Sequence, residues 1–210
     1  MGNSVVVTGT DTGIGKTIFS AGLVQALGAT YWKPVQAGLE EETDSEVVAR
    51  LSGRPTLAET YRLKMPASPH LAAEAENIEI ATKDLAIPTV DGTLIIEGAG
   101  GPMVPLNRKR LYLDLFAQWN APVILCARTQ LGTINHSLMS IAALKNAGCQ
   151  MNGIAFIGEP EPEVEQTICD FGNVENLGRL PKLDPLNSDS LANAFAQNIN
   201  LDSIREVLNK

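Results

Sequence analysis

Short apolar runs alternate with amphipathic segments along most of the chain. The runs are rich in valine, isoleucine and leucine, a pattern typical of strands that are buried on both faces of a sheet. We expect such strands at residues 4–8, 30–32, 93–97, 123–127, 154–157 and, from a weaker pattern, 174–180.

Apolar residues recur with the helical period between most of these runs. Helices are predicted at residues 17–27, 44–51, 111–119, 135–147, 162–171 and 201–208. Alternating strands and helices predict an α/β fold, with a mostly parallel sheet and helices on both of its faces. Prolines 66, 69 and 88 interrupt residues 65–88, so this segment is expected to be an irregular excursion around a short helix at 70–75.

The composition is that of one folded domain, because 44% of the 210 residues are hydrophobic and 19% are charged. The net charge of −8 would repel duplex nucleic acid and anionic membranes, so neither is an expected partner. An anionic ligand would therefore need a local binding device.

The cysteines Cys126, Cys149 and Cys169 are widely spaced, which favours buried thiols in a reducing compartment over disulfides or a zinc site. No lysine or arginine precedes Lys16, so no signal peptide is expected. No apolar stretch approaches the ~20 residues of a membrane span. We therefore expect a soluble, cytoplasmic protein.

The sequence Gly9-Thr-Asp-Thr-Gly-Ile-Gly-Lys-Thr17 lies between the first predicted strand and the first predicted helix, the context of a phosphate-binding loop. Backbone N–H groups of such a turn bind an anion, and Lys16 adds a positive charge at the β- and γ-phosphates. The hydroxyl of Thr17 would then bind Mg²⁺. The loop is longer than usual, with five residues between Gly9 and Gly15. The alternative is a turn that carries a GKT sequence by chance.

Charged residues also stand where other predicted strands end and where a helix begins. Glu97 ends a strand and precedes a glycine-rich turn, a placement that suits a Mg²⁺ ligand beside a phosphate loop but is also common in structural turns. Lys33 follows the second predicted strand, at the edge of the sheet where ligands bind. This position favours a phosphate- or carbonyl-directed role, although a lone surface lysine is usually only solvated. Asp44 begins a helix, where an acid also stabilises the helix dipole.

Taken together, these motifs resemble the dethiobiotin synthetase family, the ATP-dependent enzymes that close the ureido ring in biotin synthesis. The resemblance covers nearly the whole chain and implies a single, doubly wound P-loop NTPase-type domain over residues 1–210. It also implies a homodimer that binds its substrate at the subunit interface. The matching pieces are residues 9–17, Lys33-Pro34-Val35 with Gly38, Asp44, Ser68-Pro69-His70, residues 97–101 and residues 131–136.

The resemblance implies a reaction of ATP and CO₂ (or bicarbonate) with 7,8-diaminononanoate, through a carbamate and a carbamic-phosphoric anhydride. Lys16 and Lys33 would be catalytic, and Thr17, Asp44 and Glu97 would hold Mg²⁺. The implied nucleotide contacts are Gly13, Ile14, Gly15, Lys16, Thr17, Ile18, Asp44, Glu97, Gly98, Ala99, Gly100, Leu180, Pro181 and Lys182. The implied substrate contacts are Thr12, Lys33 and Ala37, with Gly132, Thr133 and Asn135 reaching in from the neighbouring subunit.

The chain departs from the family pattern at two positions. Ala37 stands where a hydroxyl residue commonly contacts the diamine. Ile157 stands near the place where an asparagine often reads adenine, so we expect weak discrimination between nucleobases. Of the histidines, His70 is expected either to line the diamine pocket or to pack, and His136 to cap a helix or pack in the core rather than to catalyse.

Two other functions share the phosphate loop. A regulatory switch ATPase of the division and partition type would carry a lysine earlier in the loop, where this chain has Thr10-Asp11. An amidotransferase-type synthetase for corrinoid side chains would need a glutaminase domain, for which 210 residues leave no room. We therefore predict an ATP-dependent cyclo-ligase, with the switch ATPase as the alternative.

Overall fold

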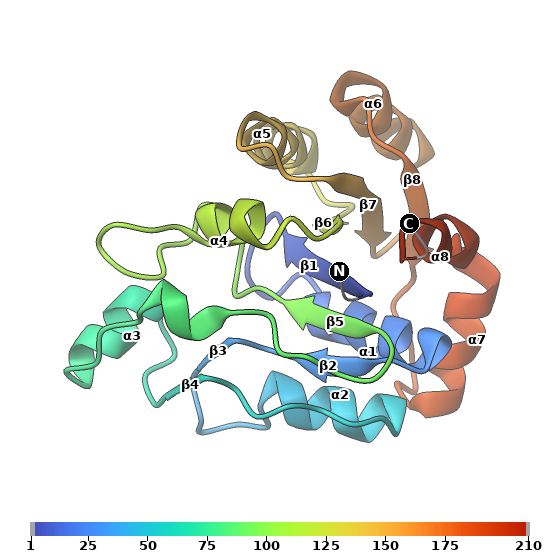
Figure 1. The fold of residues 1–210 in the computed structure, drawn as a ribbon. Helices are drawn as coiled ribbons and strands as arrows, with labels where there is room; N and C mark the ends of the chain where they lie inside the picture. The colour runs from blue at the N-terminus through green and yellow to red at the C-terminus, as the bar shows by residue number, and fades with distance from the viewer. Residues whose placement is uncertain (1–2, 209–210) are drawn as a thin grey trace.

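The computed structural model describes residues 3–208, and its main feature is a six-stranded sheet between two layers of helices (Figure 1). Every pair of neighbouring strands in this sheet is parallel, which confirms the predicted fold class. The strand order is β2-β5-β1-β6-β7-β8. The strands are β1 (Ser4–Gly9), β2 (Thr30–Trp32), β5 (Leu94–Glu97), β6 (Val123–Arg128), β7 (Met151–Ile157) and β8 (Asn176–Leu180).

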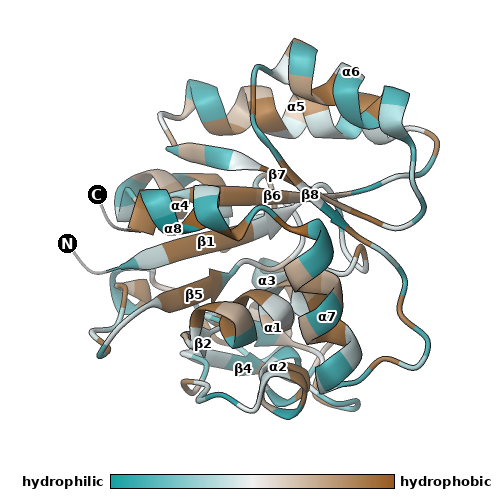
Figure 2. Cartoon of the chain, turned by 90° about the vertical axis from the view of Figure 1, so that its right-hand side faces the viewer, coloured by the Kyte–Doolittle hydropathy of each residue, from teal (hydrophilic) through white to brown (hydrophobic). Residues whose placement is uncertain are grey.

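Alternate side chains of the central strands enter two separate cores. In β1, Val5 and Val7 pack in one core and Val6 in the other, as the two-residue period of a strand requires. Helices α3 (Pro69–Ala75), α4 (Tyr112–Trp119), α5 (Thr133–Asn146) and α6 (Pro162–Gly172) contribute to the core of Val6. Helices α1 (Lys16–Leu27), α2 (Asp44–Ser52), α7 (Ser188–Asn198) and α8 (Leu201–Leu208) contribute to the other core. Figure 2 shows the hydrophobic strands between these helices.

The structure contains elements that the sequence pattern does not predict. Strands β3 (Val35–Ala37) and β4 (Tyr61–Leu63) pair in parallel as a separate small sheet. The predicted excursion at residues 65–88 is irregular apart from α3 and the short 3₁₀ helix η1 (Thr82–Leu85). Helix α7 was also missed. Predicted bounds were otherwise close, with the largest difference at β7, which begins at Met151 rather than at residue 154.

The carboxyl ends of β1, β5 and β2 lie side by side, because β5 pairs with both of the other strands. Ligands of open parallel sheets bind at this edge. The topology therefore brings together the loop after β1, Glu97 at the end of β5 and Lys33 just after β2.

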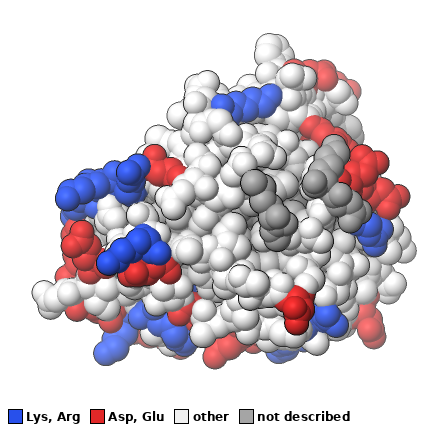
Figure 3. Space-filling model, viewed as in Figure 1, with Lys and Arg blue, Asp and Glu red and all other residues white. Residues whose placement is uncertain are grey.

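The surface carries both signs of charge. On the face seen in Figure 3, basic side chains lie next to acidic ones, and uncharged residues occupy much of the remaining surface. Within residues 3–208, no helix combines the length and the apolar character that crossing a membrane requires.

Candidate active site

The phosphate loop runs from the end of β1 into the first turn of α1. Gly15 precedes the helix with a φ of 98°, a left-handed conformation that favours glycine. A Cβ atom there would also lie 3.0 Å from Cγ2 of Ile157, so any other residue would strain the loop. The first N–H groups of α1 have no intrahelical acceptor and are placed to bind an anion, as the motif predicts.

Lys16 lies over this loop and is buried, with 6% of its surface exposed. Its Nζ donates to the carbonyl oxygen of Asp11 at 2.7 Å, and the carboxylate of Asp11 pairs with Arg128 at 2.7 Å. Burial lowers the pKa of Lys16, and the positive charge of Lys33 adds to this effect, although the negative charge of Glu97 opposes it. The ammonium group is thus held at the loop by a single carbonyl, which a phosphate oxygen could replace.

Thr17, Asp44 and Glu97 meet beside this lysine, from α1, α2 and β5. Oγ1 of Thr17 donates to Oδ1 of Asp44 at 2.8 Å and lies 3.1 Å from Oε1 of Glu97. Asp44 is the first residue of α2, but Thr43 caps this helix together with Glu46. The carboxylate of Asp44 therefore faces the pocket rather than the end of its own helix.

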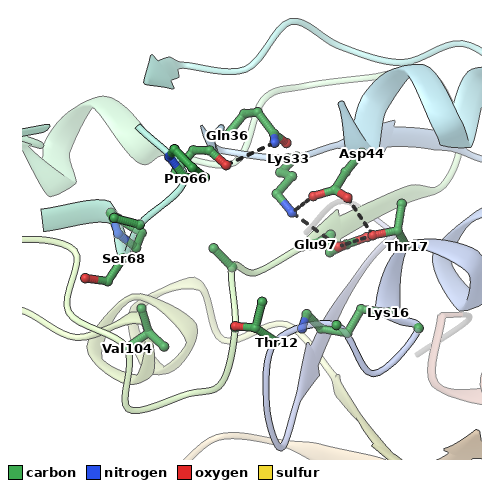
Figure 4. A pocket seen from close by; sticks show the side chains of 17 residues that line it. Thr12, Lys16, Thr17, Lys33, Gln36, Asp44, Pro66, Ser68, Glu97 and Val104 are labelled. Carbon is green, nitrogen blue, oxygen red and sulfur yellow. Dashed lines mark hydrogen bonds and ion pairs between the residues drawn. The ribbon is translucent and has the colours of Figure 1, made fainter. Parts of the chain in front are cut away.

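Lys33 lies between these two carboxylates. Its Nζ donates to Oδ2 of Asp44 and lies 3.3 Å from Oε1 of Glu97 (Figure 4). Burial alone would lower the pKa of Lys33, but the charges of Glu97 and Asp44 outweigh this and raise it above the usual range. For the acidic Asp44 the effects have the opposite sign. Burial would raise its pKa, but the Lys33 ammonium and the Thr17 hydroxyl hold the pKa below the usual value. Lys33 is a full positive charge at neutral pH.

Sequence reasoning missed a contact of Glu97 with the core. The hydroxyl of Tyr31 donates to Oε2 of Glu97 at 3.0 Å, and both residues are fully buried. Tyr31 stands within the β2 run and its pattern indicates only a core aromatic. No sequence signal indicates that its hydroxyl reaches Glu97.

The two lysines, Thr17 and the two carboxylates line one pocket of about 540 Å³. The predicted residues that line it are Thr12, Gly13, Gly15, Lys16, Thr17, Lys33, Ala37, Asp44, Glu97, Ala99 and Gly100. The pocket extends from the phosphate loop past Lys33 to the segment before α3 (Figure 4). Ser68 and Pro69 of the Ser-Pro-His motif lie there, and the lining residues that the sequence did not indicate are Gln36, Pro66, Ala67 and Val104.

Other predicted site residues lie outside this pocket. Ile14 and Gly98 are buried beneath the loops, and Ile18 is half-buried. Leu180, Pro181 and Lys182 end β8 and begin the next loop, where the carbonyl oxygen of Leu180 accepts from the N–H of Gly158 at 3.0 Å. Gly132, Thr133 and Asn135 form the start of α5.

The structure corrects one of the expectations for the histidines. His136 is exposed in the first turns of α5, so it is not a core residue. His70 faces a different cavity, of about 250 Å³, which Glu74 and Arg108 also line. Its Nδ1 lies 3.1 Å from Oγ of Ser68, a residue that lines the main pocket. All three cysteines are free and buried, as expected.

The oxygen atoms of Thr17, Asp44 and Glu97 are the candidate metal ligands. Among the described residues, no group of three histidine, cysteine, aspartate or glutamate side chains is placed to hold a metal. The candidate site instead combines one hydroxyl with two carboxylates, which is an all-oxygen set of the kind that Mg²⁺ prefers. The Lys33 ammonium already contacts both carboxylates, so this position suits a cation.

A parallel sheet with a phosphate loop after its first strand defines a P-loop ATPase, and solved structures share this fold. The chain superimposes on MinD of Pyrococcus horikoshii OT3, solved with Mg-ADP, with a TM-score of 0.56 and 16% identity over 99% of this chain and 95% of that one. It superimposes on a ParA family ATPase of Chlorobium tepidum TLS with a TM-score of 0.54 and 8% identity, over 99% and 98% of the chains. At these identities the likeness concerns the fold alone.

Sequence relatives identify the family within this class. Residues 3–190 match the family described as an AAA domain. The chain is 57% identical to the ATP-dependent dethiobiotin synthetase BioD of Rhodopseudomonas palustris (strain HaA2), over 96% of both chains. It is 54% identical to the BioD of Brucella ovis, over 99% of both chains. The chain belongs to the ATP-dependent dethiobiotin synthetase family, which confirms the resemblance predicted from its motifs.

Proposed function

We propose that the protein closes the ureido ring of dethiobiotin from 7,8-diaminononanoate, CO₂ and ATP, with release of ADP and phosphate. The observation that carries this proposal is the pocket itself, in which Lys16 and Lys33 meet Thr17, Asp44 and Glu97. The pocket continues beyond the phosphate loop to residues 66–69. A second ligand can therefore lie beside the γ-phosphate, as a synthetase requires and a simple nucleotide switch does not.

The nucleotide would lie along the loop of residues 9–17. Its phosphates would accept from the backbone of Gly13–Ile18 and from Nζ of Lys16, which would leave the carbonyl of Asp11. Glu97, Gly98, Ala99 and Gly100 would border the terminal phosphate. The segment Leu180, Pro181 and Lys182 would contact the base, mainly through its backbone.

Mg²⁺ would be held by Thr17, Asp44 and Glu97, because their oxygen atoms fit the preference of a hard cation. Oγ1 of Thr17 lies 2.8 Å from Oδ1 of Asp44 and 3.1 Å from Oε1 of Glu97. Bound there, the ion would neutralise the charge that develops on the phosphates during transfer. Lys33 would supply its positive charge from the side of the second ligand. No nucleophilic side chain is needed, because the reacting groups belong to the substrates.

The chemistry would need positioning more than covalent catalysis. One amine adds to CO₂ and loses a proton to form a carbamate. A carbamate oxygen attacks the γ-phosphorus and ADP leaves. The second amine then attacks the carbamoyl carbon and loses a proton, phosphate leaves with the bonding electrons, and the ring closes. Lys33, between the phosphate loop and residues 66–69, would hold the anionic carbamate in line with the phosphate.

The first prediction is that phosphate release requires the diamine. A synthetase that hydrolysed ATP alone would lose its intermediate, so ATP, Mg²⁺ and bicarbonate without the diamine should give only background release. Phosphate should be measured with and without 7,8-diaminononanoate, and dethiobiotin should form in equal amount. Equal ATP turnover in both mixtures would contradict the proposal and support the switch ATPase.

The second prediction is that each site needs two chains. The start of α5, with Gly132, Thr133 and Asn135, lies outside the pocket of its own chain, and the adjacent Leu131 is fully exposed. We therefore propose a homodimer in which this helix start binds the carboxylate of the diamine held by the neighbouring subunit. Sedimentation should give a dimer.

Mixing two variants of low activity tests this sharing directly. Lys16→Ala and Asn135→Ala subunits, each weakly active alone, should regain about a quarter of wild-type activity when mixed, because half of the dimers are hybrids with one intact site. The unmixed parents are the controls. A fully active monomer, or no recovery after subunit exchange, would contradict a shared site.

A further inference from the structure

The two carboxylate oxygens of Glu97 have different partners. Oε1 faces the pocket, 3.1 Å from Oγ1 of Thr17 and 3.3 Å from Nζ of Lys33. Oε2 faces the core and accepts from the hydroxyl of Tyr31 at 3.0 Å. Glu97 is fully buried, so Oε2 has no access to water that could replace this hydrogen bond.

The sheet register explains how Tyr31 reaches Glu97. In the parallel pair of β2 and β5, Tyr31 lies opposite Ile95. Glu97 is two residues further along β5, and its side chain therefore leaves the sheet on the same face as that of Ile95. Tyr31 and Ile95 belong to the same core, and the length of the phenol ring carries its hydroxyl to the end of β5.

The hydroxyl is the donor in this hydrogen bond, because a carboxylate oxygen accepts. A carboxylate that accepts a fixed donor on one oxygen has its rotation restricted.

We propose that Tyr31 is a positioning residue, which holds Oε2 of Glu97 so that only Oε1 faces a divalent cation bound with Thr17 and Asp44. This inference rests on the proposed role of Glu97 as a metal ligand. Partners that orient a ligating carboxylate in this way influence metal affinity although they do not touch the metal. Without the hydroxyl, the carboxylate is free to rotate and Oε2 is buried without a donor.

The test is Tyr31→Phe, which removes the hydroxyl and keeps the ring. Mn²⁺ serves as the probe, titrated into the protein with ADP, and free Mn²⁺ is measured by electron paramagnetic resonance. The dissociation constant for Mn²⁺ should rise about 10- to 100-fold, the usual range for loss of such a partner. In assays, the Mg²⁺ concentration for half-maximal rate should rise in parallel, while the KM for ATP at saturating Mg²⁺ stays unchanged.

Tyr61→Phe is the matched control. The hydroxyl of Tyr61 also donates to a carboxylate at 3.0 Å, that of Asp84, but neither residue lines the pocket. This variant should bind Mn²⁺ as the wild type does. The thermal unfolding of both variants should be recorded, because a purely structural role of Tyr31 would lower the melting temperature without changing Mn²⁺ binding, and that result would overturn the proposal.

Glu97→Gln separates failure of this proposal from failure of the proposed site. If Glu97→Gln weakens Mn²⁺ binding and Tyr31→Phe does not, Glu97 is a ligand that needs no help from Tyr31. If neither variant weakens binding, Glu97 is not a metal ligand, and the proposed metal site fails together with the role of Tyr31.

Discussion

Replacing Lys16 with alanine should lower turnover at least ~100-fold, the loss expected when one charged group that stabilises a transition state is removed. The reason is local to the phosphate loop. Lys16 is the buried cation at the end of the anion-binding turn, and its Nζ is bonded only to the carbonyl oxygen of Asp11 among the described residues. No other lysine of the loop could take its place, because the earlier positions are Thr10 and Asp11.

Lys145→Ala is the matched control for Lys16→Ala. Its Nζ also donates to backbone carbonyl oxygens, those of Gly172 and Asn173, but it lies on α5 outside the pocket. It should keep wild-type turnover. Steady-state kinetics with saturating ATP and diamine measure both variants, and circular dichroism confirms folding. Near-normal turnover in a folded Lys16→Ala protein would contradict the assignment of the phosphate loop.

The central strands could be predicted from the sequence because they are buried on both faces. Residues 5–7 and 123–127 are wholly apolar runs, which is typical of strands in a parallel sheet that is covered on both faces. Strands β3 and β4 escaped prediction because a polar residue, Gln36 or Arg62, stands at the centre of each and interrupts the apolar run. Their pairing also depends on the course of the chain between them.

Helix α7 escaped prediction although local signals were present. Asn187 caps the helix by accepting from the N–H of Ser190, and the buried Leu191, Ala194 and Phe195 follow the spacing of one helix face. Polar and small residues around them dilute this pattern. The signal could have been found from the cap, which is typical of a helix start.

The site, too, has parts that the sequence predicts and parts that it does not. The phosphate loop is contiguous in sequence, so its role followed from the motif. The meeting of Lys33, Asp44 and Glu97 was implied only by the family resemblance, because they come from separate elements and sequence spacing does not give their distances. Tyr31 could not be found, because an aromatic residue in a short apolar strand is usually a packing residue.

The loss of Lys33 should affect both turnover and stability. In Lys33→Met, the buried carboxylate of Glu97 and the half-buried one of Asp44 would face each other without the cation that now contacts both. Removing one partner of a buried ion pair costs about 3–5 kcal/mol of folding free energy. The carboxylate of Asp44 is partly exposed and water can solvate it in the variant, so we expect a loss near the lower figure. Turnover should fall at least ~100-fold, since a charge beside the transferred phosphate is lost.

The exposed Arg50 offers the control. It pairs at 2.7 Å with the exposed carboxylate of Glu42, and neither residue lines the pocket. Arg50→Met removes a cation from a carboxylate, as Lys33→Met does, but from a pair that is solvated on both sides. It should cost no more than about 1 kcal/mol and leave turnover unchanged.

The stability difference between Lys33→Met and the wild type should depend on pH with a definite sign. In the wild type, the pKa of Asp44 lies below its usual value because of Lys33 and Thr17, which outweigh the effect of burial. The stabilisation from this pair is therefore complete above the usual pKa of 3.8 and is lost as the pH falls through the lower folded value. The variant lacks this contribution and therefore does not lose it as the pH falls. Urea unfolding at pH 7 and at a pH below 3.8 should thus give a large difference in unfolding free energy at the higher pH and a smaller one at the lower. A difference that stays constant, or grows on acidification, would mean that Lys33 stabilises the fold by packing and not as the counter-charge of Asp44 and Glu97.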